Sequence, residues 1–169
     1  MLPLEGDRKP QLLIGGPSSK QRASFSPDGR WIAYSSYESA RPEIYVQPFP
    51  TTGAKYQITT TGGTSPVWSP DGQQLFYLQQ VQPPLGRLMS VDVRIQAGFA
   101  YANSTALFDQ VLLVPLGPSV GSWPYDIAPD GKRFVVVTPA ANVSSEKTPN
   151  PEIRVTLNWF EELKQRVPR

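Results

Sequence analysis

The chain has 169 residues, which corresponds to one domain that is large enough to bury a core. Its 16 basic and 14 acidic side chains give a formal charge of +2 and are scattered, so we expect no binding to nucleic acid or to an anionic membrane. The sequence contains no histidine and no cysteine. These absences exclude Ser-His-Asp and Cys-His catalysis, zinc held by imidazole or thiolate, and disulfides.

Neither a membrane-spanning segment nor a signal peptide is evident. No apolar stretch approaches the roughly 20 residues that a helix needs to cross a bilayer. Residues 1–5 lack the basic start and the apolar run of a secretory leader. We therefore expect a soluble protein that is not exported by this route, with the cytoplasm as its default compartment.

The first apolar elements lie at residues 2–4 and 11–14, on either side of a turn at residues 7–10. This arrangement predicts a pair of outer strands. No inner pair of strands is predicted before them. We interpret residues 1–15 as the outer strands of an incomplete structural unit.

Downstream, an internal repeat dominates the sequence. Residues 24–34, 67–77 and 126–136 share a Pro-Asp-Gly centre, and the central aspartates are separated by 43 and then 59 positions. A spacing of about 40–45 residues fits one four-stranded blade of a β-propeller, and the longer spacing fits a blade with an insertion. The repeat therefore predicts a propeller.

Each Pro-Asp-Gly centre predicts a hairpin turn between two strands. Proline presets the first central φ, aspartate caps its own backbone and glycine adopts a positive φ. Equivalent turns of successive blades lie far apart around one rim. We therefore expect Asp28, Asp71 and Asp130 to stabilise their own turns rather than to form a calcium cluster.

Nearly continuous apolar runs follow the turns, which is typical of a strand covered on both faces by neighbouring blades. The sequence predicts three blades of antiparallel strands, at residues 21–58, 64–108 and 122–157.

The outer strands are less regular. Fourth strands are predicted at residues 55–58 and 105–108, and the third blade has none. In its place residues 158–166 carry good helix formers, with Asn158 as N-cap and Glu161 as its capping-box partner. The predicted fold class is all-β: a β-propeller with four-stranded antiparallel blades, about three blade cores plus a half blade, and a short C-terminal helix.

Residues 25–34 resemble the TolB-like class of WD-repeat-like propeller repeats, and residues 44–50 followed by Gln57-Ile58 strengthen the match. The ending at residues 157–164 is similar to the C-terminus of propeller sensor regions behind bacterial serine/threonine protein kinases. The resemblance implies a bacterial propeller, usually of six or seven blades, that binds or scaffolds. A kinase's Gly-rich loop, His-Arg-Asp and Asp-Phe-Gly are absent, so we expect no kinase activity.

Candidate binding residues come from the rim opposite the Pro-Asp-Gly turns, where other loops meet around the channel mouth. They are Tyr37, Glu38, Arg41, Glu43, Asp109, Trp123, Tyr125 and Asp126. Of these, Tyr37, Glu38, Arg41, Trp123 and Tyr125 are the predicted binding set. The alternative interpretation is that Glu38, Arg41 and Glu43 form a solvated edge and that Tyr125 belongs to the core.

The sequence favours two functions and leaves a glycosidase that uses a pair of carboxylates as a weaker third option. The first is a non-catalytic module that presents one rim to a protein, peptide or small ligand. The second is a Ca²⁺-dependent hydrolase of lactones or esters, such as an acyl-homoserine lactone lactonase, with Asp126 and Glu43 as catalytic candidates. Its candidate metal ligands are Asp126, Glu43, Asp109 and Asn103.

An incomplete ring of blades predicts self-association. A partial propeller leaves an open blade face at each end, and closure removes such faces. Two chains together would supply six blade cores. We therefore expect a homo-oligomer, most simply a dimer in which residues 11–14 supply a missing outer strand to a partner.

Overall fold

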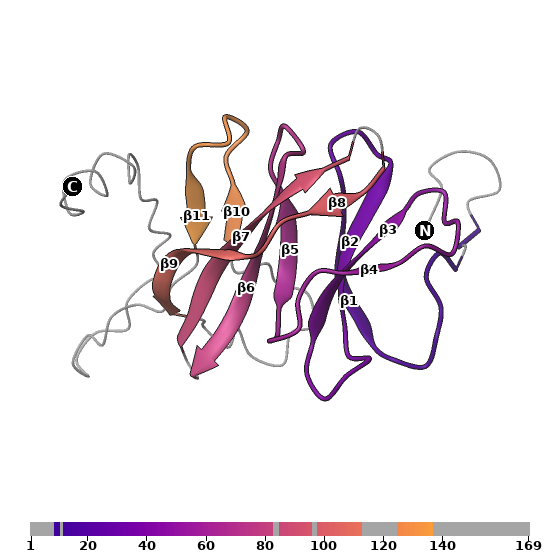
Figure 1. Cartoon of the computed structure of the whole chain (residues 1–169), viewed down its shortest axis with the longest axis horizontal. Helices are drawn as coiled ribbons and strands as arrows, with labels where there is room; N and C mark the ends of the chain where they lie inside the picture. Colours follow the sequence, from indigo (N-terminus) through magenta and orange to yellow (C-terminus); the bar gives the residue numbers. More distant parts are fainter. Residues whose placement is uncertain (1–8, 11, 83–84, 96–97, 113–124, 137–169) are drawn as a thin grey trace.

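The computed structural model describes residues 9–10, 12–82, 85–95, 98–112 and 125–136. Every regular element assigned within these ranges is a β-strand, and the strands pair in antiparallel sheets (Figure 1). In Figure 1 the sheets succeed one another across the molecule in chain order, from β1–β4 through β5–β9 to β10 and β11. The predicted all-β propeller architecture of antiparallel blades is confirmed.

Blade 1 is a four-stranded sheet in the order β1-β2-β3-β4. Its strands are β1 (Lys20–Phe25), β2 (Trp31–Ser36), β3 (Glu43–Pro48) and β4 (Tyr56–Gln57). The second strand is buried along its whole length, as its apolar run predicts. The fourth strand is shorter than the predicted residues 55–58.

Blade 2 has the same order of strands with a divided outer edge. Its strands are β5 (Thr64–Trp68), β6 (Gln74–Gln82), β7 (Leu85–Arg94), β8 (Ala100–Tyr101) and β9 (Thr105–Leu112). Both β8 and β9 pair with β7 on the side away from β6. The outer strand predicted at residues 105–108 is therefore present, longer than expected, and preceded by a separate two-residue strand.

Blade 3 is described as one hairpin, formed by β10 (Tyr125–Ile127) and β11 (Phe134–Val136). It corresponds to the inner half of the predicted third blade. The predicted third strand of this blade and the helix at residues 158–166 lie outside the described residues.

The three Pro-Asp-Gly segments form the predicted turns. Gly29, Gly72 and Gly131 have φ values of 70°, 69° and 69°, which only glycine adopts without strain. Each of these glycines donates its N–H to the carbonyl three residues earlier, at 2.8–2.9 Å. The aspartates cap the turns: Asp28 and Asp71 each accept a backbone N–H two residues on, at 3.1 and 3.0 Å.

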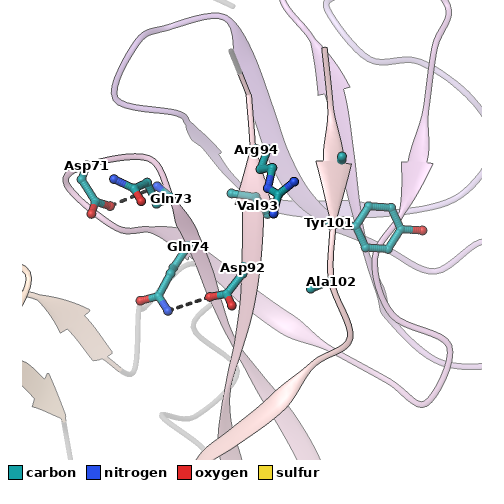
Figure 2. Close-up of a pocket in the computed structure, with 9 residues that line it drawn as sticks. Asp71, Gln73, Gln74, Asp92, Val93, Arg94, Tyr101 and Ala102 are labelled. Carbon is teal, nitrogen blue, oxygen red and sulfur yellow. Dashed lines mark hydrogen bonds between the residues drawn. The ribbon is translucent and has the colours of Figure 1, made fainter. Parts of the chain in front are cut away.

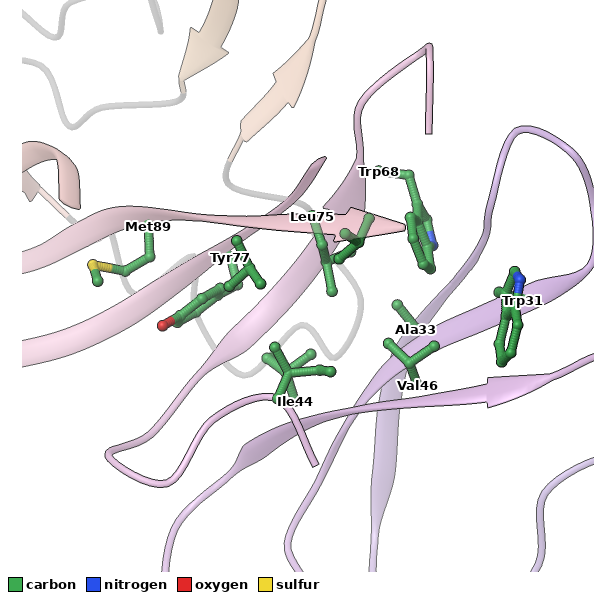
Figure 3. Packing of buried hydrophobic residues seen from close by; sticks show 11 residues of the cluster. Trp31, Ala33, Ile44, Val46, Trp68, Leu75, Tyr77 and Met89 are labelled. Carbon is green, nitrogen blue, oxygen red and sulfur yellow. The ribbon is translucent and has the colours of Figure 1, made fainter. Parts of the chain in front are cut away.

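The hydrophobic core lies between blades rather than within them. Blade 1 contributes Trp31, Ala33, Ile44 and Val46 to a cluster that blade 2 completes with Trp68, Leu75, Tyr77 and Met89 (Figure 3). A second cluster joins blade 2 to the hairpin of blade 3 through Phe76, Leu78, Tyr125 and Phe134. Packing of neighbouring sheets face to face is the arrangement that a propeller requires.

The strand expected at residues 11–14 is not formed in its described part. Leu12, Leu13 and Ile14 carry no strand assignment, while residues 1–8 and Gln11 lie outside the described residues. Leu13 and Ile14 instead pack against Ile32, Tyr34 and Tyr45 of blade 1. Side-chain burial thus fixes this segment without a ladder of backbone hydrogen bonds.

Candidate functional site

Two loops of blade 1 meet at the rim opposite the Pro-Asp-Gly turns. The first connects β2 to β3 at residues 37–42, and the second connects β4 to β5 at residues 58–63. The N–H of Gly63 donates to the carbonyl of Pro42 at 2.8 Å, which joins the two loops. The N–H of Tyr37 donates to the carbonyl of Ser19 at 3.1 Å, which ties the first loop to the start of β1.

Two of the predicted binding residues are exposed on this rim. Tyr37 is 45% exposed, and the side chain of Arg41 is 60% exposed. Glu38 is engaged differently, because its carboxylate pairs with Lys55 Nζ at 2.5 Å and accepts a bond from Ser36 Oγ at 3.3 Å. The hydrogen bond from Lys55 lowers the pKa of Glu38 below its ordinary value.

Glu43 is buried, and its predicted place on a solvated edge is wrong. The residue is 2% exposed. One carboxylate oxygen accepts Thr59 Oγ1–H at 2.5 Å, both accept the N–H of Gly62 at 3.0–3.1 Å, and Arg41 Nε lies 3.9 Å away. A buried charge is stable only when it is bonded in this way. Glu43 therefore anchors the loop at residues 58–63 and lies within ion-pair distance of Arg41 in the first loop.

Tyr125 also belongs to the interior. It is 2% exposed, and its hydroxyl donates to the carbonyl of Ser65 in blade 2 at 2.7 Å. Burial raises its pKa well above the ordinary value of 10. Its neighbour Asp126 is exposed and accepts the N–H of Ile127 at 2.8 Å. The core interpretation of Tyr125 is correct, and Trp123 lies outside the described residues.

The candidate metal ligands come from different elements. Glu43 lies in β3, Asn103 in the link between β8 and β9, Asp109 in β9 and Asp126 in β10. Over the described ranges, no three carboxylates are grouped closely enough to hold a metal ion. Glu43, in addition, already accepts bonds from protein donors. Calcium binding and the hydrolase that depends on it stay predictions.

A groove lies on the rim that carries the Pro-Asp-Gly turns, and it was not predicted from the sequence. It has a volume of about 640 Å³ and lies between the turn that follows β5 and the outer edge formed by β7 and β8 (Figure 2). Its polar lining residues are Asp71, Gln73, Gln74, Asp92, Arg94 and Tyr101. The alternation of residues 91–94 indicated exposure of Asp92 and Arg94, but the two-residue β8 gave no signal in the sequence.

The inner strands carry a bulge that the sequence also did not predict. Arg22 in β1 and Ser65 in β5 hold equivalent positions and have φ values of 54° and 56°, which non-glycine residues rarely adopt. The register of each strand shifts at this point. The guanidinium of Arg22 donates to Ser65 Oγ. The two bulges thereby join the inner strands of blades 1 and 2.

Comparison with known proteins identifies the repeats. A 54-residue segment is 46% identical to the Tol-Pal system protein TolB of Alcanivorax borkumensis, and 55 residues are 48% identical to that of Pseudomonas aeruginosa. The chain carries TolB-like propeller repeats. These segments span 31% and 32% of this chain but only 12% of each relative. No family model matches the sequence.

The fold comparison agrees with the repeats. A TolB structure from Agrobacterium tumefaciens superposes with a TM-score of 0.50 at 20% identity, covering 71% of this chain and 38% of the neighbour. At this identity the likeness establishes the propeller fold alone. The chain thus spans about two fifths of a TolB structure and about an eighth of the curated relatives. No helix long and apolar enough to cross a membrane occurs in the part of the chain that the structure describes.

Proposed function

We propose that this protein is a non-catalytic propeller module that binds a protein or peptide through the rim bearing Tyr37 and Arg41. TolB-like repeats support a binding or scaffolding role, because such a repeat supplies a rigid frame for loops. The observation that carries the proposal is the buried Glu43 carboxylate. Its hydrogen bonds anchor the loop at residues 58–63, which the Gly63 N–H joins to the loop that bears Tyr37 and Arg41.

The exposed chemistry of the rim suits a polypeptide ligand. Tyr37 offers apolar area together with a hydroxyl, and the Arg41 guanidinium can pair with a carboxylate. Tyrosine and arginine are enriched among residues that dominate binding energy. Loops that are already anchored lose little entropy on binding. We therefore expect a peptide ligand that carries an acidic side chain or a free C-terminal carboxylate.

A peptide array followed by calorimetry tests this proposal. Tyr37→Ala and Arg41→Ala should each weaken binding of the selected peptide by about tenfold or more. The matched control is Tyr101→Ala, since Tyr101 is equally exposed at 45% but lies on the opposite rim. Affinity unchanged in both rim variants, or catalytic turnover without any binder, contradicts the proposal.

We propose further that two copies assemble into a dimer that completes one propeller. The described part of one chain provides two blades and the inner hairpin of a third, whereas propellers close with about four to eight blades. Two copies would supply four blades and two further inner hairpins, which together make six blade cores. Light scattering at micromolar concentration should give twice the chain mass of 18.7 kDa, and a stable 18.7 kDa species contradicts this assembly.

A further inference from the structure

Successive blades touch through the same two turn residues. A Cβ atom placed on Gly72 of blade 2 lies 3.6 Å from Cδ of Pro27 in blade 1. One placed on Gly131 of blade 3 lies 3.7 Å from Cδ of Pro70 in blade 2. The proline of each Pro-Asp-Gly turn therefore packs beside the glycine of the next turn, at both junctions that the structure describes.

Blade 1 carries the same glycine and the same apolar position, and the described residues place no blade beside them. No described atom lies within 4 Å of a Cβ placed on Gly29. Trp68 of blade 2 is 5% exposed and donates its indole N–H to the carbonyl of Ser24 in blade 1 at 3.3 Å. Phe25, which holds the position of Trp68 in blade 1, is 48% exposed.

A third group on this side of blade 1 lacks a partner. Tyr34 is 1% exposed, and its hydroxyl makes no hydrogen bond to any described residue. A buried hydroxyl left in this state destabilises the fold, because it has lost its hydrogen bonds to water. Burial also raises the pKa of Tyr34 to about 12. Its counterpart Tyr77 packs in the cluster that blades 1 and 2 share.

The N-terminal segment covers only part of this side. Leu13 and Ile14 pack against the cluster that contains Tyr34, while Leu12 is 87% exposed. We call the exposed surface formed by Leu12, Phe25 and Gly29 the leading face of blade 1. An exposed apolar surface of this kind marks an interaction site.

The last described hairpin, β10–β11, presents a matching turn. Pro129 is exposed in the turn of blade 3, at the position of Pro27 and Pro70. Ile127 packs toward blade 2, so the alternation of a strand turns Asp126 to the other side, where it pairs in register with Val135. Asp126 holds the position of Ser24, the residue that receives Trp68 at the first junction.

We propose that the leading face of blade 1 docks the β10–β11 hairpin of a second copy. In this arrangement the second copy's Pro129 packs beside Gly29, and Phe25 packs beside Asp126 and Val135 of that copy. The occupant is a second copy because the surface suits a Pro-Asp-Gly hairpin, and blade 3 of the same chain presents one with an exposed proline. Two such contacts, related by a twofold axis, close a ring. The inference rests on the proposed dimer and names its surface.

Light scattering of the full chain and two variants tests the surface. Phe25→Asp introduces a charge on the leading face and should weaken the dimer by tenfold or more, since an unpaired charge is costly to bury. Val81→Asp is the control, because Val81 is also exposed, at 57%, but lies at the far end of β6 in blade 2. This control should stay dimeric. Circular dichroism checks that both variants fold.

Disulfide trapping gives a readout that does not depend on a destabilising charge. The chain has no cysteine, so Phe25→Cys and Asp126→Cys can be purified separately, mixed and oxidised. A disulfide requires Cα atoms about 4.4–6.8 Å apart. We expect a cross-linked heterodimer from this pair and none from Val81→Cys mixed with Asp126→Cys.

The outcomes separate this inference from the dimer on which it rests. A dimer that survives Phe25→Asp and gives no cross-link between positions 25 and 126 uses another surface, and it overturns the inference alone. A stable monomer of the natural chain overturns both the inference and the dimer. The leading face would then be left to a different protein.

Discussion

At the scale of single residues, the turn aspartates make the stability of the folded state depend on pH in the acidic range. Asp71 accepts Ser69 Oγ–H at 2.6 Å and the N–H of Gln73 at 3.0 Å. The bond from Ser69, followed by that from Gln73, lowers the pKa of Asp71 below 3.8. A carboxyl whose pKa is lowered by folding stabilises the folded state above its unfolded pKa, and this contribution is lost as the pH falls through the folded value.

We predict that Asp71→Asn reduces the loss of stability between about pH 5 and pH 2. Asparagine can still accept both hydrogen bonds but does not titrate. Because the side chain is exposed, the difference from the natural chain should stay below about 1 kcal/mol. Urea denaturation at a series of pH values measures it. Parallel curves for the two proteins at all pH values would contradict the prediction.

The contrast between Asp71 and Glu43 illustrates what sequence reasoning reached at this scale. The turn aspartates were predicted correctly because their partners are the next two residues, so the motif contains its own explanation. Glu43 bonds with Thr59 and Gly62, which follow it by 16 and 19 positions. No residue next to Glu43 in the sequence indicates those partners. Glu43 was therefore expected at the surface, where charged residues usually lie.

At the scale of elements, Gly63 sets the distance between blades 1 and 2. Its φ lies outside the left-handed region, so its need for glycine is steric. A Cβ atom there would lie 2.8 Å from Ile44 Cγ1 and 3.1 Å from Tyr77 Cδ2, one on each blade. These distances are shorter than van der Waals contact, so a methyl group at this junction would force the blades apart.

We predict that Gly63→Ala lowers the free energy of unfolding by about 1–3 kcal/mol, the usual cost of overpacking. Gly15→Ala is the matched control, because Gly15 also lies outside the left-handed region and its Cβ would meet only Leu12, at 3.4 Å or more. The control should be neutral or slightly stabilising, since alanine restricts the unfolded chain. Equal midpoints of urea unfolding for the two variants would contradict the steric explanation.

The positions of some strands follow from the local sequence pattern, whereas the structure of other segments depends on tertiary packing. The inner strands on either side of each Pro-Asp-Gly turn were located correctly, because the turn and the apolar run specify both position and type. The paired outer strand at residues 11–14 was wrong over Leu12–Ile14. The apolar side chains of this segment are compatible with a strand and also with a loop that packs on Tyr34. Hydrophobic periodicity alone does not distinguish the two structures.

At the scale of the whole molecule, two of the three hydrophobic clusters in the described residues are shared between blades, and the third lies in blade 1 and the segment before it. The larger cluster is shared by blades 1 and 2, and the second is shared by blade 2 and the hairpin of blade 3. Polar contacts cross the same junctions, including those from Arg22 to Ser65 and from Tyr125 to the Ser65 carbonyl. A repeat that contacts only its neighbours derives much of its stability from those interfaces.

This sharing predicts that the blades unfold together. Leu75 is 0% exposed in the cluster between blades 1 and 2, so Leu75→Ala should cost about 2–5 kcal/mol. With Trp123 and Trp159 replaced by phenylalanine in both proteins, tryptophan fluorescence reports on Trp31 and Trp68 in that cluster. Far-ultraviolet circular dichroism reports on all strands. At one protein concentration, both urea transitions should coincide and shift equally in the variant.

Val81→Ala, at an exposed position, should shift neither by more than about 0.5 kcal/mol. A fluorescence transition that moves while the circular dichroism transition stays in place would show that the blades are independent units.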